Sequence, residues 1–309
     1  MKSIIQTKIN FKKKQGLKLF LIAIPFMIFI IAFNYVPLFG WIYAFYDFHP
    51  TMGAVLAHQK FVGLANFAEL WKEREDLIRV LGNTLAMGGL GLLVSPLPVL
   101  LAILLSEVRS LKFKKIVQVT STFPNFISWI VVFGIATSVF SSIGLISHVI
   151  KALGGTPPII GLLGDVNHVW IFQTLLGVWK GVGWSSIIYL AAIAGIDQEL
   201  YEAVTVDGAN KFQLILHVTI PGILPTFLVL FLLGISFILS NGFDQYFVFH
   251  NSIVSDKITS LDLFTYQLAI IGSRYSYSIA FGIAKTFVSV LLLFSANSLA
   301  RRIRGENII

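Results

Sequence analysis

The chain has 309 residues, of which 56% are hydrophobic and only 12% charged, and its mean hydropathy is +0.82. An ordinary soluble domain carries about 25% charged residues, so this chain has too few polar side chains to cover a water-facing surface. The composition excludes a disordered chain, a collagen-like fibre and a typical soluble enzyme. It predicts an all-α integral membrane protein.

The net charge of +8 does not indicate a nucleic-acid partner, because the basic residues cluster at the ends of apolar segments. The sequence contains no cysteine, which excludes disulfides and thiolate-bound metals. The six histidines are scattered without metal-ligand spacing, and there is neither an H-E-x-x-H motif nor a G-x-x-x-x-G-K-[ST] phosphate loop. We therefore expect no metal, no cofactor and no enzymatic activity on this chain.

Six apolar segments are long enough to cross a bilayer, which takes about 20 residues. Backbone groups in lipid must bond within their own segment, so each segment is predicted to be a helix. Four of the spans are predicted at residues 19–46, 81–106, 169–196 and 275–300; the third is contained in residues 116–147, and the fifth lies within residues 218–243. Residues 19–300 thus form one membrane domain between a basic N-terminal segment, residues 1–18, and a short tail, residues 301–309.

Basic residues predict the orientation of these spans. Six lysines precede the first span, four basic residues lie between the second and third spans, and three arginines follow the sixth. All three regions fall on one side of a six-span protein, and Lys and Arg gather on the cytoplasmic side of short loops. Both termini are therefore predicted to lie in the cytoplasm of a cell-membrane protein.

Three shorter features are predicted from local signals. Residues 62–79 read as a short helix on the outer face, with Asn66 as its N-cap. Pro124 predicts an irregularity within the third span. Gly88, Gly89 and Gly91 are read as a site of close helix packing.

The loop between the fourth and fifth spans, residues 196–222, carries a helix–turn–helix pattern. Asp197 is an N-cap residue, and Gly208 suits the left-handed conformation that ends a helix. Asn210 and Gln213 have the spacing of a capping box for a second helix. Pro221 is expected to end or kink that helix before the fifth span.

This loop resembles the EAA motif of the membrane subunits of binding-protein-dependent ABC importers. The resemblance rests on Glu202-Ala203, Asp207-Gly208-Ala209 and Pro221, within the segment EAVTVDGANKFQLILHVTIP. Three further segments resemble the maltose-type sugar branch of this family: VGLANFAEL after the first span, NTLAMG at the start of the second and SYSIAFGIAKT at the start of the sixth. The likeness therefore covers most of the chain. One departure is Val204, which stands where the motif usually has a second alanine and adds bulk to the first helix.

The resemblance implies the type I ABC importer fold and a permease for oligosaccharides or polysaccharide fragments. Its partners would be a second, related permease, two ATPase subunits that bind ATP and Mg, and an extracytoplasmic sugar-binding protein. The first helix of the loop would be a coupling helix that docks on the ATPase. The residues that correspond to the coupling motif are Glu202, Ala203, Asp207, Gly208 and Ala209.

Charged and aromatic residues inside the spans suggest a substrate path. Lys180 is flanked by Trp179 and Trp184, whose faces can stack on sugars; it either lines a sugar path or forms a structural ion pair with Asp244 or another charge. Asp244 and Gln245 are further candidates to bind sugar hydroxyls. Lys285, in the sixth span, either snorkels to the membrane surface or pairs structurally.

Two other functions compete with the importer. An ion-coupled secondary transporter would use the intramembrane charges as a relay, but the EAA-like loop argues against it. A membrane-embedded transferase is weaker still, since no acid–base constellation is recognisable.

Overall fold

The computed structural model describes residues 16, 18–53, 55–157, 160–240 and 242–304. This part of the chain is almost entirely helical, and six of its helices are long and apolar enough to span a membrane. The all-α membrane fold is thereby confirmed. The six are Lys18–Phe45, Arg74–Glu107, Trp129–Ala152, Val169–Ala194, Lys211–Ser236 and Tyr275–Ser295.

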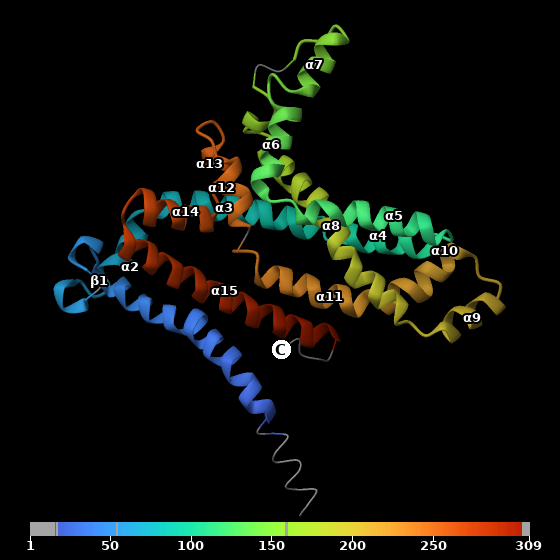
Figure 1. Ribbon diagram of the computed structural model, residues 1–309, viewed down its shortest axis with the longest axis horizontal. Coiled ribbons are helices and arrows are strands. Elements are labelled where there is room, and N and C mark those ends of the chain that lie inside the picture. Colours follow the sequence, from blue (N-terminus) through green and yellow to red (C-terminus); the bar gives the residue numbers. More distant parts are fainter. Residues whose placement is uncertain (1–15, 17, 54, 158–159, 241, 305–309) are drawn as a thin grey trace, which may run out of the picture. The chain divides into compact units, whose positions relative to one another are not determined.

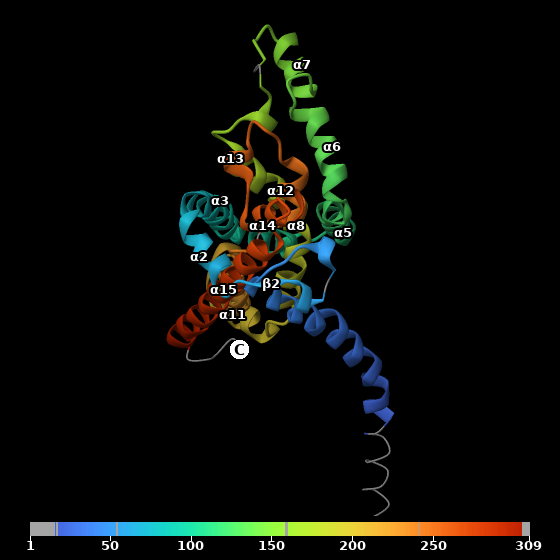
Figure 2. The same cartoon turned by 90° about the vertical axis from the view of Figure 1, so that its left-hand side faces the viewer.

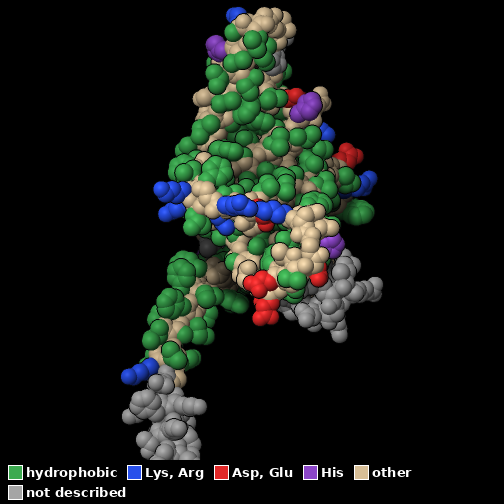
Figure 3. All heavy atoms as spheres, turned by 90° about the vertical axis from the view of Figure 1, so that its right-hand side faces the viewer, with side chains coloured by type: hydrophobic (Ala, Val, Ile, Leu, Met, Phe, Trp, Pro, Cys, Tyr) green, Lys and Arg blue, Asp and Glu red, His purple; other side chains and the backbone are tan. Residues whose placement is uncertain are grey.

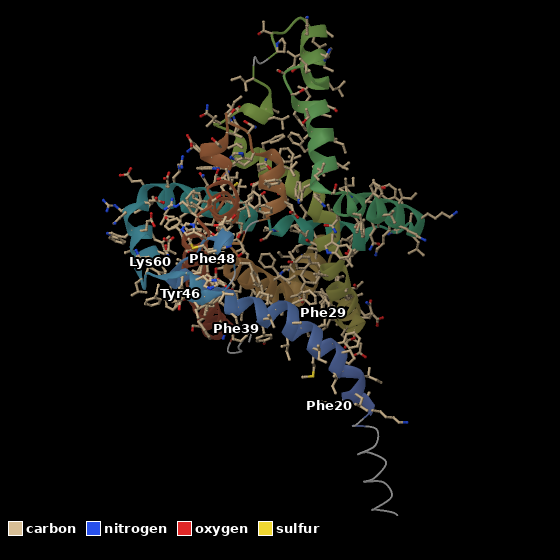
Figure 4. All side chains as sticks on the ribbon, turned by 60° about the vertical axis from the view of Figure 1, so that its left-hand side comes forward. Phe20, Phe29, Phe39, Tyr46, Phe48 and Lys60 are labelled. Atoms are coloured by element: carbon tan, nitrogen blue, oxygen red, sulfur yellow. The ribbon has the colours of Figure 1, made fainter. Side chains whose placement is uncertain are left out.

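The chain divides into two compact units, one of residues 1–71 and 268–283, the other of residues 72–267 and 284–309. The first unit begins with the helix Lys18–Phe45, whose second half consists of a π segment, η1 (Ile31–Tyr35), and a 3-10 segment, η2 (Val36–Phe45). Phe20, Phe29 and Phe39 are distributed along this helix (Figure 4). None of the residues in its most apolar window is buried within the chain, against 17–22% in the other five helices.

A small antiparallel ribbon follows, which the sequence did not predict. Strand β1 (Tyr46–Asp47) pairs with β2 (Lys60–Phe61), and two short 3-10 turns, η3 (Pro50–Met52) and η4 (Leu56–His58), lie between them. Helix α2 (Ala65–Lys72) confirms a short helix within the predicted range of residues 62–79, although the residues from Arg74 onward belong to the next helix; its position on the outer face stays a prediction. Asn66 does not cap it, however; the residue lies within α2, and its amide donates to the carbonyls of Ala44 and Tyr46. Asn66 therefore ties α2 to the ribbon instead.

The second unit is built on α8 (Val169–Ala194), which packs against α3 (Arg74–Leu93), α4 (Pro96–Glu107), α5 (Leu111–Thr122) and α11 (Ile220–Ser236). Its buried apolar cluster includes Met87, Val132, Phe172, Phe249 and Leu263. The predicted second span begins earlier than expected, at Arg74, and is interrupted near Ser95, where Pro96 starts α4.

The predicted third span, residues 116–147, is broken. Helix α5 gives way to a 3-10 turn, η5 (Phe123–Phe126), and a separate helix α6 (Trp129–Phe140) begins beyond it. Pro124 has no N–H to continue the ladder, and the side chain of Ser128 accepts a hydrogen bond from Val131 N to cap α6. Figures 1 and 2 show α6 and the next helix, α7 (Leu145–Ala152), turning away from the direction of α5. The irregularity predicted at Pro124 is confirmed, but it is a full break.

The fifth span, predicted to lie within residues 218–243, is confirmed by α11, which stops at Ser236; a new helix, α12 (Phe243–Phe249), begins after Gly242. The Asn-Gly pair at residues 241–242 is a strong turn signal. The remaining elements are η6 (Leu162–Gly164), α9 (Gln198–Val206), α10 (Lys211–Leu214), η7 (Ile215–Thr219), α13 (Ser255–Ile258), α14 (Leu261–Tyr266), η8 (Gln267–Ile271) and α15 (Tyr275–Arg304).

Candidate functional site

The loop between the fourth and fifth spans forms the predicted pair of capped helices, α9 and α10. The carboxylate of Asp197 accepts a hydrogen bond from Glu199 N at 3.1 Å, and Gly208 has φ +82°. The capping box is complete, since Asn210 Oδ1 accepts from Gln213 N at 3.0 Å and Gln213 Oε1 accepts from Asn210 N at 2.8 Å. Both caps and the glycine turn are therefore formed as the sequence indicates.

The residues of the motif lie on the surface of this loop. Glu202, Ala203, Asp207 and Gly208 are exposed, whereas Ala209 is half-buried. Val204 is also half-buried, so the extra methyl groups are directed partly into the chain rather than wholly onto the exposed face. Acidic side chains gather at this end of the second unit, below a row of basic ones (Figure 3). The loop thus offers a small, exposed and acidic helical surface.

Two side-chain contacts attach the loop to the spans. Tyr201 on α9 shares a hydrogen bond of 3.0 Å with the hydroxyl of Thr219, and Lys211 Nζ lies 2.9 Å from Glu107 Oε2 at the end of α4. Of the two outcomes expected at Pro221, an end or a kink of the second helix, the helix does not end there but changes its geometry. A π turn, Ile215–Thr219, leads straight into α11, and this wider turn accommodates the missing N–H of the proline.

A pocket of about 550 Å³ lies between α3, α8, α11 and α12. The predicted glycine patch forms part of its wall, through Gly88 and Gly91, and α8 contributes Gly177 and Gly181. None of the described residues that line it is charged. Its polar wall is formed by Ser95, Gln173, Thr174, Ser185, Tyr189, Ser240, Gln245 and Tyr246. A cavity of this size, with a few polar groups on an apolar wall, can hold a small ligand or one unit of a longer one.

Gln245 is the one predicted path residue among those that line this pocket. Its amide donates at 2.8 Å both to the main-chain oxygen and to the side-chain oxygen of Gln173, and both residues are buried. Sequence reasoning missed Gln173, although a glutamine in the middle of a spanning segment is itself a signal, because a buried amide must find partners.

Lys180 lies beside the pocket but contacts main-chain oxygens. Its ammonium donates to Asn125 O at 2.7 Å and to Pro124 O at 3.4 Å, and lies 5.5 Å from the ring centroid of Trp129. The alternative ion pair with Asp244 is not among the ion pairs of the described residues, and Asp244 is exposed. The carbonyls freed by the break in the third span are therefore its partners.

The two tryptophans occupy different positions around α8. Trp184 is about half exposed and makes an edge-to-face contact with Phe126, the ring centroids being 5.7 Å apart. Trp179 is 43% exposed. Neither lines the pocket, so the structure brings Lys180 and Trp184 together at the broken third span, with Trp179 and Asp244 apart from them.

The second intramembrane lysine, Lys285, forms an ion pair with Asp262 of α14, and both side chains are largely buried. This settles the choice between snorkelling and pairing in favour of pairing. Outside the spans, the hydrogen bond from His168 lowers the pKa of Asp165. Across the described residues, no group of three or more His, Asp or Glu side chains could hold a metal ion.

The protein has the features of a multi-pass membrane transport subunit. These are six spanning helices, a doubly capped loop at one end and a polar-lined pocket among the spans. Residues 94–305 match the family described as binding-protein-dependent transport system inner membrane component. The chain therefore belongs to this family of transport components. The match confirms the family that the EAA-like loop indicated.

Full-length relatives support the assignment. The chain is 36% identical to protein LplB of Bacillus subtilis, over 94% of this chain and 90% of that protein. It is 35% identical to the polygalacturonan/rhamnogalacturonan transport system permease YteP of the same organism, over 94% and 89%. A crystal structure of a bacterial ABC transporter that imports the acidic polysaccharide alginate contains a chain with TM-score 0.83 and 31% identity, covering 94% of this chain and 97% of that one.

Proposed function

We propose that this protein is the transmembrane subunit of an ATP-driven importer that moves oligosaccharides or polysaccharide fragments across the cell membrane. The observation that carries the proposal is the full-length likeness to YteP and to the alginate importer, combined with an intact capped loop around Gly208. The glycan class comes from those two proteins, whose names specify polygalacturonan or rhamnogalacturonan and alginate.

The subunit works within a larger assembly. A second, related permease completes the path, two ATPase subunits bind ATP and Mg and hydrolyse ATP, and an extracytoplasmic sugar-binding protein delivers the substrate. A related alginate transporter has been crystallised with its periplasmic protein bound to an alginate pentasaccharide, which supports the last partner. This chain itself holds no cofactor in the proposal.

The loop of α9 and α10 is the coupling element. Glu202, Ala203, Asp207, Gly208 and Ala209 form the contact with the ATPase, because they are the matching residues of the motif and most of them are exposed. Movement of α9 passes to the spans through the Tyr201–Thr219 hydrogen bond and the Lys211–Glu107 ion pair. Rigid-body transmission of this kind requires a loop that does not bend, and the two complete caps supply that stiffness.

The pocket between the spans is this subunit's share of the translocation path. From the pocket wall, Gln245 offers its side-chain oxygen as an acceptor for sugar hydroxyls, because both N–H groups of its amide are already bonded to Gln173. Lys180 and Trp184 extend the path beyond the pocket, and the half-exposed ring of Trp184 provides a surface for sugar C–H groups. Trp179 and Asp244 do not line the pocket, and they remain predicted path residues. In this proposal residues 19–300 are the permease domain, and residues 1–18 and 301–309 are cytoplasmic, as the basic loops predict.

The proposal is tested in vesicles that contain the complex of both permeases and the ATPase, with the sugar-binding protein supplied outside. We expect uptake of a pectin or alginate oligosaccharide that requires ATP and continues when the proton gradient is collapsed. Uptake that follows an ion gradient without ATP would contradict the importer and favour the secondary transporter.

A further inference from the structure

The two lysines within the spans are compensated in different ways. Lys285 is neutralised by Asp262, whereas none of the ion pairs among the described residues includes Lys180. Main-chain carbonyls and an aromatic ring stabilise an ammonium through dipoles and a quadrupole, but they leave its full positive charge in place. Charges within a membrane domain are costly and are usually found next to a partner or a functional cavity.

The ammonium of Lys180 also has a donor to spare. It carries three N–H groups, and its two acceptors in the described structure are the oxygens of Asn125 and Pro124. The bond to Pro124 is long, at 3.4 Å. A carboxylate that approached the ammonium could therefore accept a hydrogen bond from the third N–H group, while the 2.7 Å bond to Asn125 stays in place.

Lys180 does not line the pocket itself, but its neighbours on α8 do. In an α-helix, Lys180 lies about 60° around the axis from Gly177, which lines the pocket together with Gly181. A side chain at Gly181 would meet nothing within 4 Å, and one at Gly177 would meet only Gln245 Oε1 at 3.8 Å. These glycines leave room for a ligand to pass along α8 within reach of the flexible lysine stem.

The described residues that line the pocket include no Asp, Glu, Lys or Arg. The pocket therefore supplies no charge that would compete with Lys180 for an anionic ligand. The nearest acidic residue in the α12 wall is Asp244, which neighbours Gln245 in the chain but is exposed and does not line the pocket. A half-buried, un-neutralised cation at the edge of an uncharged pocket favours an anionic ligand.

We propose that Lys180 makes this path selective for glycans that carry carboxylate groups, the uronate oligosaccharides, by forming an ion pair with a substrate carboxylate as the chain passes α8. The inference rests on the proposed function. It specifies that the substrate is negatively charged and that Lys180 is the residue that recognises this charge. Hydrogen bonds to the carbonyls of the broken third span fix the position of the Lys180 ammonium. The break at Pro124 therefore positions Lys180 before the substrate binds.

The experiment uses a matched pair of substrates in the reconstituted complex: trigalacturonate, and the same trisaccharide after its carboxyl groups have been reduced to hydroxymethyl groups. Glycan-stimulated ATP hydrolysis and uptake give kcat/KM for each substrate with the wild type, Lys180→Met and Lys180→Arg. The sugar-binding protein is identical throughout, so its own preference cancels when the ratio of acidic to neutral kcat/KM is compared between variants.

We expect Lys180→Met to lower the acidic-to-neutral ratio by about tenfold or more, the effect of losing one charge-assisted hydrogen bond. Lys180→Arg keeps a cation and should retain most of the preference. The matched control Lys151→Met removes an exposed lysine outside the pocket lining and should leave the ratio unchanged.

Equal losses for both substrates in Lys180→Met would overturn the inference, because a purely structural lysine affects every substrate alike. A higher acidic-to-neutral ratio in Lys180→Met than in the wild type would overturn it as well, while leaving the importer intact. The proposed function fails separately, if the wild type moves neither glycan with ATP.

Discussion

At the scale of single residues, the ion pair between Lys285 and Asp262 shows how the membrane domain tolerates charge. The two side chains are 13% and 28% exposed, so neither is well solvated. Taking one partner away leaves the other charge buried and alone, which costs far more than the pair itself contributes. The pair joins α14 to α15, helices that are separate in the sequence.

We predict that Asp262→Asn lowers the stability of the assembled complex by about 3 kcal/mol, because it strands the ammonium of Lys285 in a site of low polarity. The thermal unfolding midpoint of the purified complex in detergent measures this. The double variant Asp262→Asn/Lys285→Met removes both charges and should recover most of the loss. It should also retain ATP-driven uptake, since the pair is structural; abolished uptake in a stable double variant would instead indicate a relay.

Single residues also show which site features a sequence can predict. The caps at Asp197 and Asn210 and the turn at Gly208 use partners two to three positions away, so local spacing is sufficient to predict them. The partners of Lys180 lie 55 and 56 residues earlier, and Gln173 and Gln245 are 72 residues apart. Such pairs depend on how the helices pack, which composition and periodicity do not specify.

At the scale of elements, the contact between α8 and the end of α5 depends on one glycine. A Cβ at Gly183 would lie 2.1 Å from Ser121 O and 2.2 Å from Ser121 C. Both are backbone atoms, so the clash could be relieved only by separating the helices. Glycine therefore brings α8 against the break in the third span, where Lys180 finds its carbonyl partners.

We predict that Gly183→Ala destabilises the complex by about 3 kcal/mol, the upper range for overpacking a tight interior. Its matched control is Gly181→Ala, two residues away on the same helix, where the new methyl group meets nothing within 4 Å. That variant should unfold at the wild-type temperature. Comparable unfolding midpoints for the two variants would show that α8 and α5 do not approach as closely as described.

Gly208 has a different role, because it adopts φ +82° in open space, where an added Cβ would meet nothing within 4 Å. We predict that Gly208→Val costs about 1–3 kcal/mol of local backbone strain and reorients α9 relative to α10. The spans should still insert and pair with the second permease. ATPase subunits should bind weakly, and glycan uptake should be lost.

The control for this prediction is Gly208→Asn, since asparagine tolerates the left-handed conformation far better than a β-branched residue. It should retain most of the coupling, measured as glycan transported per ATP hydrolysed. If Gly208→Val shows normal ATPase binding and normal uptake, the loop is not the coupling element.

The elements themselves are predictable in number and approximate position, because an apolar run of about 20 residues has few alternatives in a membrane. Their interruptions are harder to place. Hydropathy does not distinguish one long helix from two that meet at a proline, and so the predicted third span runs through Pro124, where the helix is broken. The π turn before Pro221 escapes prediction because it keeps the helix continuous where a proline usually ends it.

At the scale of the whole molecule, the isolated chain leaves much apolar surface uncovered. The window of its first span has no buried residue, and large apolar side chains are exposed along it, including Phe26, Phe33 and Phe39. Lipid and the second permease can cover such a surface, whereas water cannot. The exposed face of the first helix is thus consistent with a subunit that is completed by its membrane and its partners.

Orientation in the membrane is a property of the whole chain, and it can be tested with single cysteines because the sequence has none of its own. The basic residues predict that both termini and the loop at Arg109–Lys115 lie in the cytoplasm, and that α7 with Lys151 lies on the opposite side. We predict that Lys151→Cys reacts with a membrane-impermeant maleimide in intact cells. Lys112→Cys, exposed on α5, should react only after the membrane is permeabilised, and a cysteine at Ile309, outside the described residues, should behave like Lys112→Cys. Labelling of Lys112→Cys from outside, with Lys151→Cys protected, would invert the topology and move the coupling loop away from any cytoplasmic ATPase.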